Sequence, residues 1–126
     1  MVTPLAAART DSSPVIVVSG QVPTDWEGRG GFQDSSPGAW NDLAVLQPLM
    51  VSSLIVENIH LVNHHLRATL TRMRAGPQGP AHLSLPLDIQ KGEVQAPWQP
   101  LDTSSSPLRC VDAEAVARIL EVLAPA

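Results

Sequence analysis

The sequence predicts an α/β protein with a partial, doubly wound parallel sheet of two to three strands, flanked by helices and followed by a C-terminal linker and helix. Three observations predict this fold class. Residues 14–20 are an unbroken β-branched run, residues 54–75 repeat apolar side chains at helical spacing, and residues 81–86 form a second strand pattern after glycine-proline breaks. Because strand, helix and strand follow one another, a βαβ unit with parallel strands is expected.

Length and composition limit the classes of protein that are possible. The 126 residues are enough for one domain with one core, and 44% hydrophobic residues with 16% charged residues exclude a disordered polyelectrolyte. A net charge of −4, without clustered Lys and Arg, gives no electrostatic basis for binding nucleic acid. No stretch reaches the ~20 apolar residues that cross a bilayer, so no membrane partner is expected. The single cysteine, Cys110, fits a reducing compartment, and a cytoplasmic protein is predicted.

The first half of the chain contains one clear strand and one long loop. Residues 2–10 are alanine-rich and predict the last turns of a helix. Residues 14–20 predict a parallel strand covered on both faces, because its side chains are almost all apolar. Residues 21–38 are rich in glycine without an apolar period and predict a loop at the carboxyl end of that strand, where α/β proteins bind ligands. Residues 40–46 predict one or two helical turns, and residues 49–51 a short strand.

The second half begins with the strongest helical pattern in the chain. Residues 54–75 predict a helix capped by Ser52 or Ser53, and apolar side chains recur along it every three or four residues: Ile55, Ile59, Val62, Leu66, Leu70 and Met73. Residues 81–86 predict a strand with leucines alternating with polar residues, and Pro86 ends its pairing because proline has no N–H to donate. Residues 90–108 predict an extended linker. Asp112 then predicts the cap of a last amphipathic helix.

Several familiar site patterns are incomplete in this sequence. His60 and His64 share a helical face but have no third zinc ligand and no adjacent glutamate. His82 and Ser84 are two apart on one strand with Asp88 beyond Pro86, which does not favour a catalytic triad, so a capping or loop-stabilising role is expected for Asp88. The glycine-rich residues 28–31 lack the Lys-Ser/Thr of a phosphate loop. No catalytic and no metal-binding residue is therefore assigned.

Three segments, in order and at plausible spacing, match one family. Residues 11–23, residues 30–34 and residues 79–89 together resemble the thiamine-diphosphate-dependent enzymes of the acetolactate synthase and pyruvate oxidase type. The resemblance implies that residues 1–95 are the later part of that family's N-terminal pyrimidine-binding domain. It also implies that residues 96–126 are the linker and first helix of a truncated central domain.

The same resemblance implies which residues approach the ligand. In the family, the loop that matches residues 21–33 lies at an active site formed between two subunits, so Gln21, Phe32 and Gln33 are expected near substrate and cofactor. A flat apolar ring and an amide suit the binding of a small 2-oxo acid. A homo-oligomer or a complementing chain is therefore implied. Asp34 stands where many relatives have Glu and Val51 where many have Lys, which leaves the substrate open.

The cofactor itself, thiamine diphosphate with Mg²⁺, is implied by the family resemblance alone. The family's activating glutamate segment and its diphosphate and metal motif have no match in these residues, so binding by this chain alone is not expected. The sequence thus predicts a truncated or partial acetolactate synthase-like domain without a complete active site. Two alternatives stay open: one piece of a split 2-oxo-acid carboligase or decarboxylase completed by another chain, and a non-catalytic interaction module that uses Trp26 and Phe32 as a docking surface.

Overall fold

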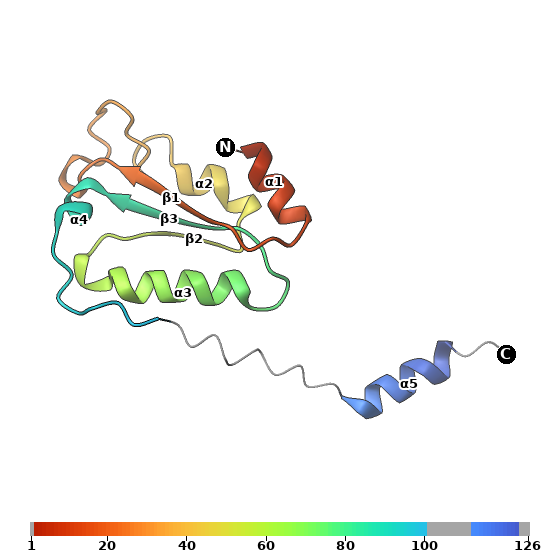
Figure 1. Ribbon diagram of the computed structural model, residues 1–126. Helices are drawn as coiled ribbons and strands as arrows, with labels where there is room; N and C mark the ends of the chain where they lie inside the picture. Colours follow the sequence, from red (N-terminus) through yellow and green to blue (C-terminus); the bar gives the residue numbers. More distant parts are fainter. Residues whose placement is uncertain (1, 101–111, 124–126) are drawn as a thin grey trace.

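A computed structural model of the protein describes residues 2–100 and residues 112–123. Three parallel strands form its sheet in the order β1-β3-β2, which are β1 (Ile16–Gln21), β3 (Ala81–Pro86) and β2 (Ser52–Ile55). Helices cover both sides of this sheet (Figure 1). The predicted fold class, a partial α/β domain with an open parallel sheet, is confirmed.

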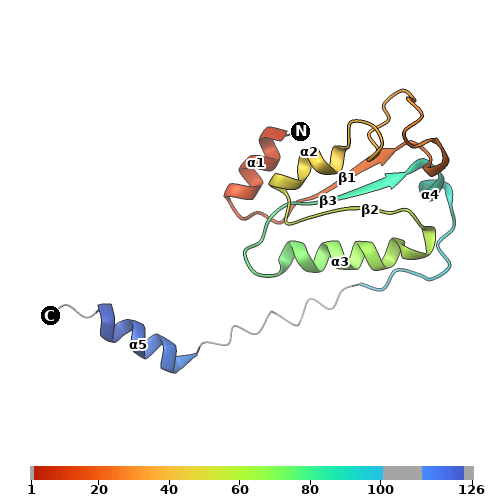
Figure 2. The ribbon, with the colours of Figure 1, turned by 180° about the vertical axis from the view of Figure 1, so that it is seen from behind.

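Helices α1 (Val2–Thr10) and α2 (Asp42–Leu46) lie on one face of the sheet, and α3 (Val62–Arg74) lies on the other. Figure 2 shows the same layers from behind. The α1/α2 face has a small core of Leu5, Leu46 and Met50 packed against Val17 and Leu49. The α3 face has the larger core, in which Val56, Leu83 and Ile89 are buried under the partly buried residues Leu54, Ile59, Val62, Leu66 and Leu85.

The predictions for residues 49–75 were partly wrong. The strand is at Ser52–Ile55 rather than at residues 49–51, because Ser52 and Ser53 pair with β3 and so do not cap a helix. The predicted helix begins only at Val62, after a short 3-10 helix, η3 (Ile59–Leu61), capped by Asn58. Leu54 of β2 and the helix residues Val62 and Leu66 pack into the core of the α3 face, whereas Ile55, the first residue of the predicted pattern, is in β2 and is not part of that core. The predicted pattern therefore runs across two different elements.

Strand β1 is not covered on both faces, contrary to the prediction. Ile16 is 38% exposed and Val18 is 56% exposed, since α3 packs against β2 and β3 while β1 is an edge strand. The strand that is buried on both faces is β3, in which His82 and Ser84 are as inaccessible as Leu83 between them. Polar residues in such a position need hydrogen-bond partners inside the protein.

The remaining described segments are short helices and loops. The predicted helix at residues 2–10 is present as α1, and residues 40–46 form α2 followed by η2 (Gln47–Leu49). Further elements are η1 (Thr24–Trp26) and α4 (Leu87–Lys91), which the sequence did not predict. Helix α5 (Ala113–Leu123) is present, and Asp112 accepts hydrogen bonds from the amides of Glu114 and Ala115 as the predicted cap.

The predicted linker lies partly outside the described residues, which omit residues 101–111. Its described part runs along α3, because Asn63 donates to the carbonyl of Ala96, and the Arg67 guanidinium lies 5.5 Å from the Trp98 ring centre. The boundary between domains at residue 95 stays a prediction. None of the helices in the described ranges is both long enough and apolar enough to cross a membrane.

Candidate functional site

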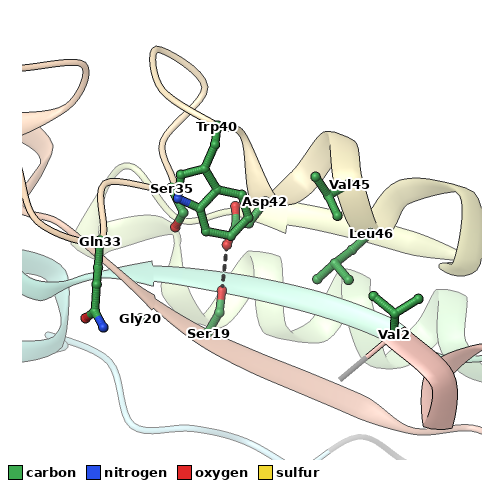
Figure 3. Close-up of a pocket in the computed structure, with 9 residues that line it drawn as sticks. All are labelled: Val2, Ser19, Gly20, Gln33, Ser35, Trp40, Asp42, Val45 and Leu46. Atoms are coloured by element: carbon green, nitrogen blue, oxygen red, sulfur yellow. Dashed lines mark hydrogen bonds between the residues drawn. The ribbon is translucent and has the colours of Figure 1, made fainter. Parts of the chain in front are cut away.

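A cleft of about 460 Å³ lies above β1, between α1, α2 and the loop of residues 22–41 (Figure 3). Its walls come from four parts of the chain, and its lining residues are Val2, Ser19, Gly20, Gln33, Ser35, Trp40, Asp42, Val45 and Leu46. The loop follows the carboxyl end of β1, which is where open parallel sheets usually bind ligands. The apolar residues are concentrated on the helices, and the polar residues on β1 and at the end of the loop.

The loop of residues 22–41 is held in a defined shape by its own polar groups. Gln21 Oε1 accepts hydrogen bonds from both the amide and the hydroxyl of Ser35, each at 3.1 Å. Asp34 accepts from the Ser36 hydroxyl at 2.6 Å and from the Gly28 amide at 2.9 Å. The hydrogen bond from the Ser36 hydroxyl, together with those from the backbone amides of Ser36 and Gly28, lowers the pKa of Asp34. These bonds hold the end of the loop against the start of α2.

Two further contacts close the loop. A Cβ placed on Gly38 would lie 3.1 Å from Gly28 Cα, so the two arms meet backbone to backbone and leave no room for a side chain. On the outer side, the amide and hydroxyl of Thr24 donate to the two oxygens of Asp88, at 3.1 and 2.7 Å. Burial acts to raise the pKa of Asp88. The hydrogen bonds that its carboxylate accepts, from Thr24 and from nearby backbone amides, outweigh burial, so the pKa is lowered overall. The loop-stabilising role predicted for Asp88 is confirmed.

A chain of hydrogen bonds crosses all three strands beneath the cleft. The His82 ring lies between two serines, with Nδ1 at 2.9 Å from Ser53 Oγ and Nε2 at 2.8 Å from Ser19 Oγ. Ser19 Oγ also lies 3.1 Å from Asp42 Oδ2 and donates to it. We call Ser53, His82, Ser19 and Asp42 the polar relay. His82 is completely buried, and burial lowers its pKa although Asp42 acts in the opposite direction.

The relay fixes the direction of each hydrogen bond. Ser19 has one hydroxyl proton and donates it to Asp42, because a carboxylate can only accept. Ser19 must then accept from His82, so the proton of the neutral ring lies on Nε2, and Nδ1 accepts from Ser53. Every donor therefore points toward Asp42. This order differs from a catalytic triad, in which the histidine accepts the proton of the serine, because here His82 donates to Ser19 and cannot act as its base.

Local backbone geometry positions Asp42 in the cleft. Asn41 adopts a left-handed conformation with φ of 54° and caps α2 by accepting a hydrogen bond from the amide of Ala44. The amide of Asp42 donates to the carbonyl of Ser35, which ties the start of α2 to the loop. The Asp42 side chain is buried, and its Oδ1 has no hydrogen-bond partner among the residues that the structure describes.

The three residues predicted from the family resemblance have different surroundings. Gln33 borders the cleft and has a φ of 61°, a left-handed conformation that is uncommon for a residue other than glycine. Phe32 is 90% exposed, so it packs against little of the protein. Gln21 is buried and holds Ser35, which is a structural role in the loop. The structure thus brings Gln33, but not Phe32 or Gln21, to the wall of the cleft.

Sequence reasoning missed Ser19, Trp40, Asp42 and His82 as neighbours. Their contacts join residues that are far apart in the chain, and the spacing along one strand does not reveal them. One signal was available: a histidine inside a short strand that the pattern placed in the core needs polar partners there. That signal indicates that a network exists but does not identify its members.

The side chains around the cleft do not fit the diphosphate and Mg²⁺ of thiamine diphosphate. Its lining contains a carboxyl group and apolar side chains but neither Lys nor Arg, so a diphosphate would meet a negative group without a counter-charge. Among the residues whose positions are described, no cluster of three or more His, Cys, Asp or Glu could hold a metal ion. Any such binding would need groups from elsewhere.

Comparison with known proteins gives relatives of one kind. No family model matches the sequence. The chain is 33% identical over 101 residues to a probable acetolactate synthase large subunit of Methanocaldococcus jannaschii, covering 80% of this chain and 16% of the relative. It is 30% identical over 95 residues to the glyoxylate carboligase of Escherichia coli O157:H7, covering 75% of this chain and 15% of that protein. An acetolactate synthase large subunit of Corynebacterium glutamicum is 27% identical over 100 residues.

These relatives are much longer than the chain, which spans about 16% of the length of the acetolactate synthase large subunits of this kind. The matches nevertheless cover most of this chain, and they agree with the family that the motifs at residues 11–23, 30–34 and 79–89 indicated. Over about 80% of its length, the chain is a homologue of the thiamine-diphosphate enzymes of the acetolactate synthase type.

Proposed function

We propose that residues 1–95 are the later part of a pyrimidine-binding domain of an acetolactate synthase-like enzyme. In this proposal the loop of residues 22–41 contributes to an active site that residues outside the described segment complete. The observation that carries the proposal is the similarity to acetolactate synthase large subunits over about 80% of the chain. The position of the loop, at the carboxyl end of a parallel strand with Gln33 on the cleft, supports it.

The described residues favour a site that is completed by other groups. Ile16 and Val18 expose one face of β1, where a larger domain would pack further structure. The cleft offers no group suited to a diphosphate. The missing groups come either from a longer form of this polypeptide or from a second chain, as in a split 2-oxo-acid carboligase or decarboxylase.

In the completed site, Gln33 binds the polar end of a small 2-oxo acid. Its amide group can donate to a carboxylate and accept from a hydroxyl, and Phe32 supplies an apolar wall beside it. The left-handed backbone of Gln33 costs about 1 kcal/mol, and such strain concentrates at functional sites. The exposure of Phe32 fits a residue that contacts a ligand or a partner rather than its own loop.

Complementation tests this function. The chain is produced together with an acetolactate synthase large subunit that lacks the homologous segment, and acetolactate formation from pyruvate is measured. The variants Phe32→Ala and Gln33→Gly should lower activity by at least about tenfold, as expected when a group that positions the substrate is lost. Glycine is chosen at position 33 because it keeps the positive φ. Arg29→Ala, an exposed change in the same loop, is the matched control.

Two results would count against the proposal. Full activity of both Phe32→Ala and Gln33→Gly in an active complex would remove these residues from the site. Calorimetric titration of the chain alone with thiamine diphosphate and Mg²⁺ should give no heat of micromolar binding. Binding at micromolar affinity would show instead that the chain carries a complete cofactor site.

A second candidate is a non-catalytic interaction module. The exposed aromatic side chains of the loop favour it, with Phe32 at 90% and Trp26 at 56% exposure. Its partner would cover this apolar surface, and the open face of β1 would enlarge the contact. Size-exclusion chromatography with light scattering decides: a soluble monodisperse monomer at high concentration contradicts a large adhesive surface, whereas self-association that Phe32→Ser abolishes supports it.

A further inference from the structure

We propose that the cleft above β1 binds a small organic cation, whose ammonium group pairs with Asp42 and whose apolar chain lies among Val2, Val45 and Leu46. This goes beyond the function proposed above, because it assigns a ligand to residues that the family resemblance does not include. It also does not depend on thiamine diphosphate. The proposal rests on one incompletely bonded carboxylate and on the charge and shape of its surroundings.

One oxygen of the buried Asp42 carboxylate has no hydrogen-bond donor among the described residues. The residue is only 5% exposed, and one oxygen, Oδ2, accepts from Ser19, whereas Oδ1 has no hydrogen bond within the part of the chain that the structure describes. A buried carboxylate oxygen without a donor is costly, and native proteins rarely leave one unbonded. Asp42 borders the cleft, so the missing donor can come from a ligand.

Within the polar relay, Ser19 donates one hydrogen bond to Asp42, and the relay brings no positive charge to the carboxylate. Ser53, His82 and Ser19 each donate toward the carboxylate, and burial keeps the imidazole neutral by lowering its pKa. His82 Nε2 lies 3.9 Å from Asp42 Oδ2, a separation at which the ring does not hydrogen-bond to the carboxylate. The cleft lining contains no Lys or Arg. Next to the Asp42 carboxylate, a cation therefore fits better than an anion.

The rest of the cleft suits the remainder of such a ligand. Trp40 is 59% exposed and lines the same cleft as Asp42, where its ring face can contact a cation. Val2 and Val45 expose about half of their surface at the mouth, which is apolar. Asp42 Oδ1 is covered in this form, so a side chain that lines the cleft, such as the exposed Trp40, must move to admit the ligand. Exposed side chains rotate within nanoseconds, so this is not a barrier to binding.

An NMR titration of the full chain tests the proposal with three probes of equal length. Butylammonium should shift the amide signals of Gly20, Asp42 and Val45 and the indole signal of Trp40, with a dissociation constant of roughly millimolar. Butyrate and butanol should bind at least about tenfold more weakly, because neither offers a cation to Asp42. Equal shifts with all three probes would mean a non-specific apolar cleft and would overturn the proposal.

Two variants and a control complete the test. Asp42→Asn keeps the size and the bond from Ser19 but places a neutral amide in the cleft, so butylammonium binding should weaken at least about tenfold. Asp25→Asn changes the net charge equally at an exposed position and should bind as the unmodified chain does. If Asp42→Asn does not fold, Val45→Phe decides by filling the mouth of the cleft. Retained binding in either folded cleft variant would refute the proposal.

Discussion

The two faces of strand β3 differ in what they contribute to the protein. Toward α3, Leu83 and Leu85 pack into an apolar core with Val56 and Ile89. Toward α1 and α2, His82 joins Ser19 and Ser53 in the polar relay that ends at Asp42. Both faces are buried, and both leave polar atoms without a partner among the described residues, Thr69 Oγ1 on α3 and Asp42 Oδ1 at the end of the relay, but of these two residues only Asp42 borders the cleft.

This difference separates the source of stability from the candidate site. The α3 face stabilises the fold through apolar burial, which needs no particular direction. The relay face contributes directional hydrogen bonds, whose net effect on stability is smaller and whose position decides what the cleft can bind. Changes on the first face should therefore alter stability without altering the cleft. Changes on the relay face should alter the cleft and should also lower stability, but by less than changes on the α3 face.

The largest loss of stability is expected for Leu83→Ala. Leu83 is 3% exposed at the centre of the α3 face, and removing its side chain should cost about 3 kcal/mol in the free energy of unfolding. Urea denaturation measures the loss. The NMR signals of Ser19 and Asp42 should change little. Leu87→Ala is the control, since Leu87 is 41% exposed, and a similar cost at both positions would contradict this division of the two faces.

Replacing His82 with Leu should cost about 2 kcal/mol, because the Ser19 and Ser53 hydroxyls each lose a buried partner. It should also change the response to pH. The folded chain binds a proton at His82 less readily than the unfolded chain, so this stabilisation is present above about pH 6.5 and is lost as the pH falls through the lowered pKa.

Urea titrations from pH 7.5 to pH 5 compare the two proteins. The unmodified chain should lose stability with falling pH, and His82→Leu should lose less over the same range. Identical slopes in both proteins would show that the buried imidazole does not determine the pH dependence.

A smaller loss of stability is expected at Ser53 of β2, and almost none at its neighbour Ser52. Ser53→Ala removes the donor to His82 and should cost about 1 kcal/mol. Ser52→Ala removes a buried hydroxyl that has no partner among the described groups, so it should be close to neutral. Thermal denaturation of both variants gives the comparison. A larger cost at Ser52 than at Ser53 would argue that the relay contributes nothing to stability.

The smallest effect concerns the loop. Thr24→Val removes the hydroxyl that donates to Asp88 at an exposed site, and it should change the free energy of unfolding by no more than about 0.5 kcal/mol. Hydrogen exchange of the amides in residues 24–31 should nevertheless become faster, since one anchor of the loop is lost. If the exchange rates do not change, the hydrogen bonds of Gln21 and Asp34 are sufficient to keep this loop ordered.

The elements that the sequence predicted correctly depend on local pattern. The β-branched residues before Gly20, the glycine-proline breaks before Ala81 and the acidic cap at Asp112 each act within a few residues. The start of α3 was wrong because Ile55 of β2 and Ile59 of η3 continue the three- and four-residue spacing of the α3 residues, so the spacing imitates a single helix. The register with β3 decides that Ser52 and Ser53 are in a strand, and local spacing does not contain it.

The candidate site was predictable only in part. The glycine-rich loop and its place after β1 follow from composition, and Gln33 lies on the cleft. The relay could not be predicted, because Ser19, Ser53 and His82 meet only through strand pairing. Strand order also decides which strand is buried on both faces. The apolar run of β1 predicted that it would be, but β1 lies at the edge of the sheet and β3 lies in the middle.

The strand order has a consequence for how the chain acquires its structure during synthesis. Of the three described strands, β3 is the last along the chain, yet it lies between the other two. Neither β1 nor β2 finds its partner until residues 81–86 have left the ribosome, so no part of this sheet forms early. Pairs such as Ile16 with Ala81 join distant residues, which slows folding. Until then the nascent chain carries the apolar residues of β1 without their partner strand, and exposed apolar residues of this kind are what chaperones bind.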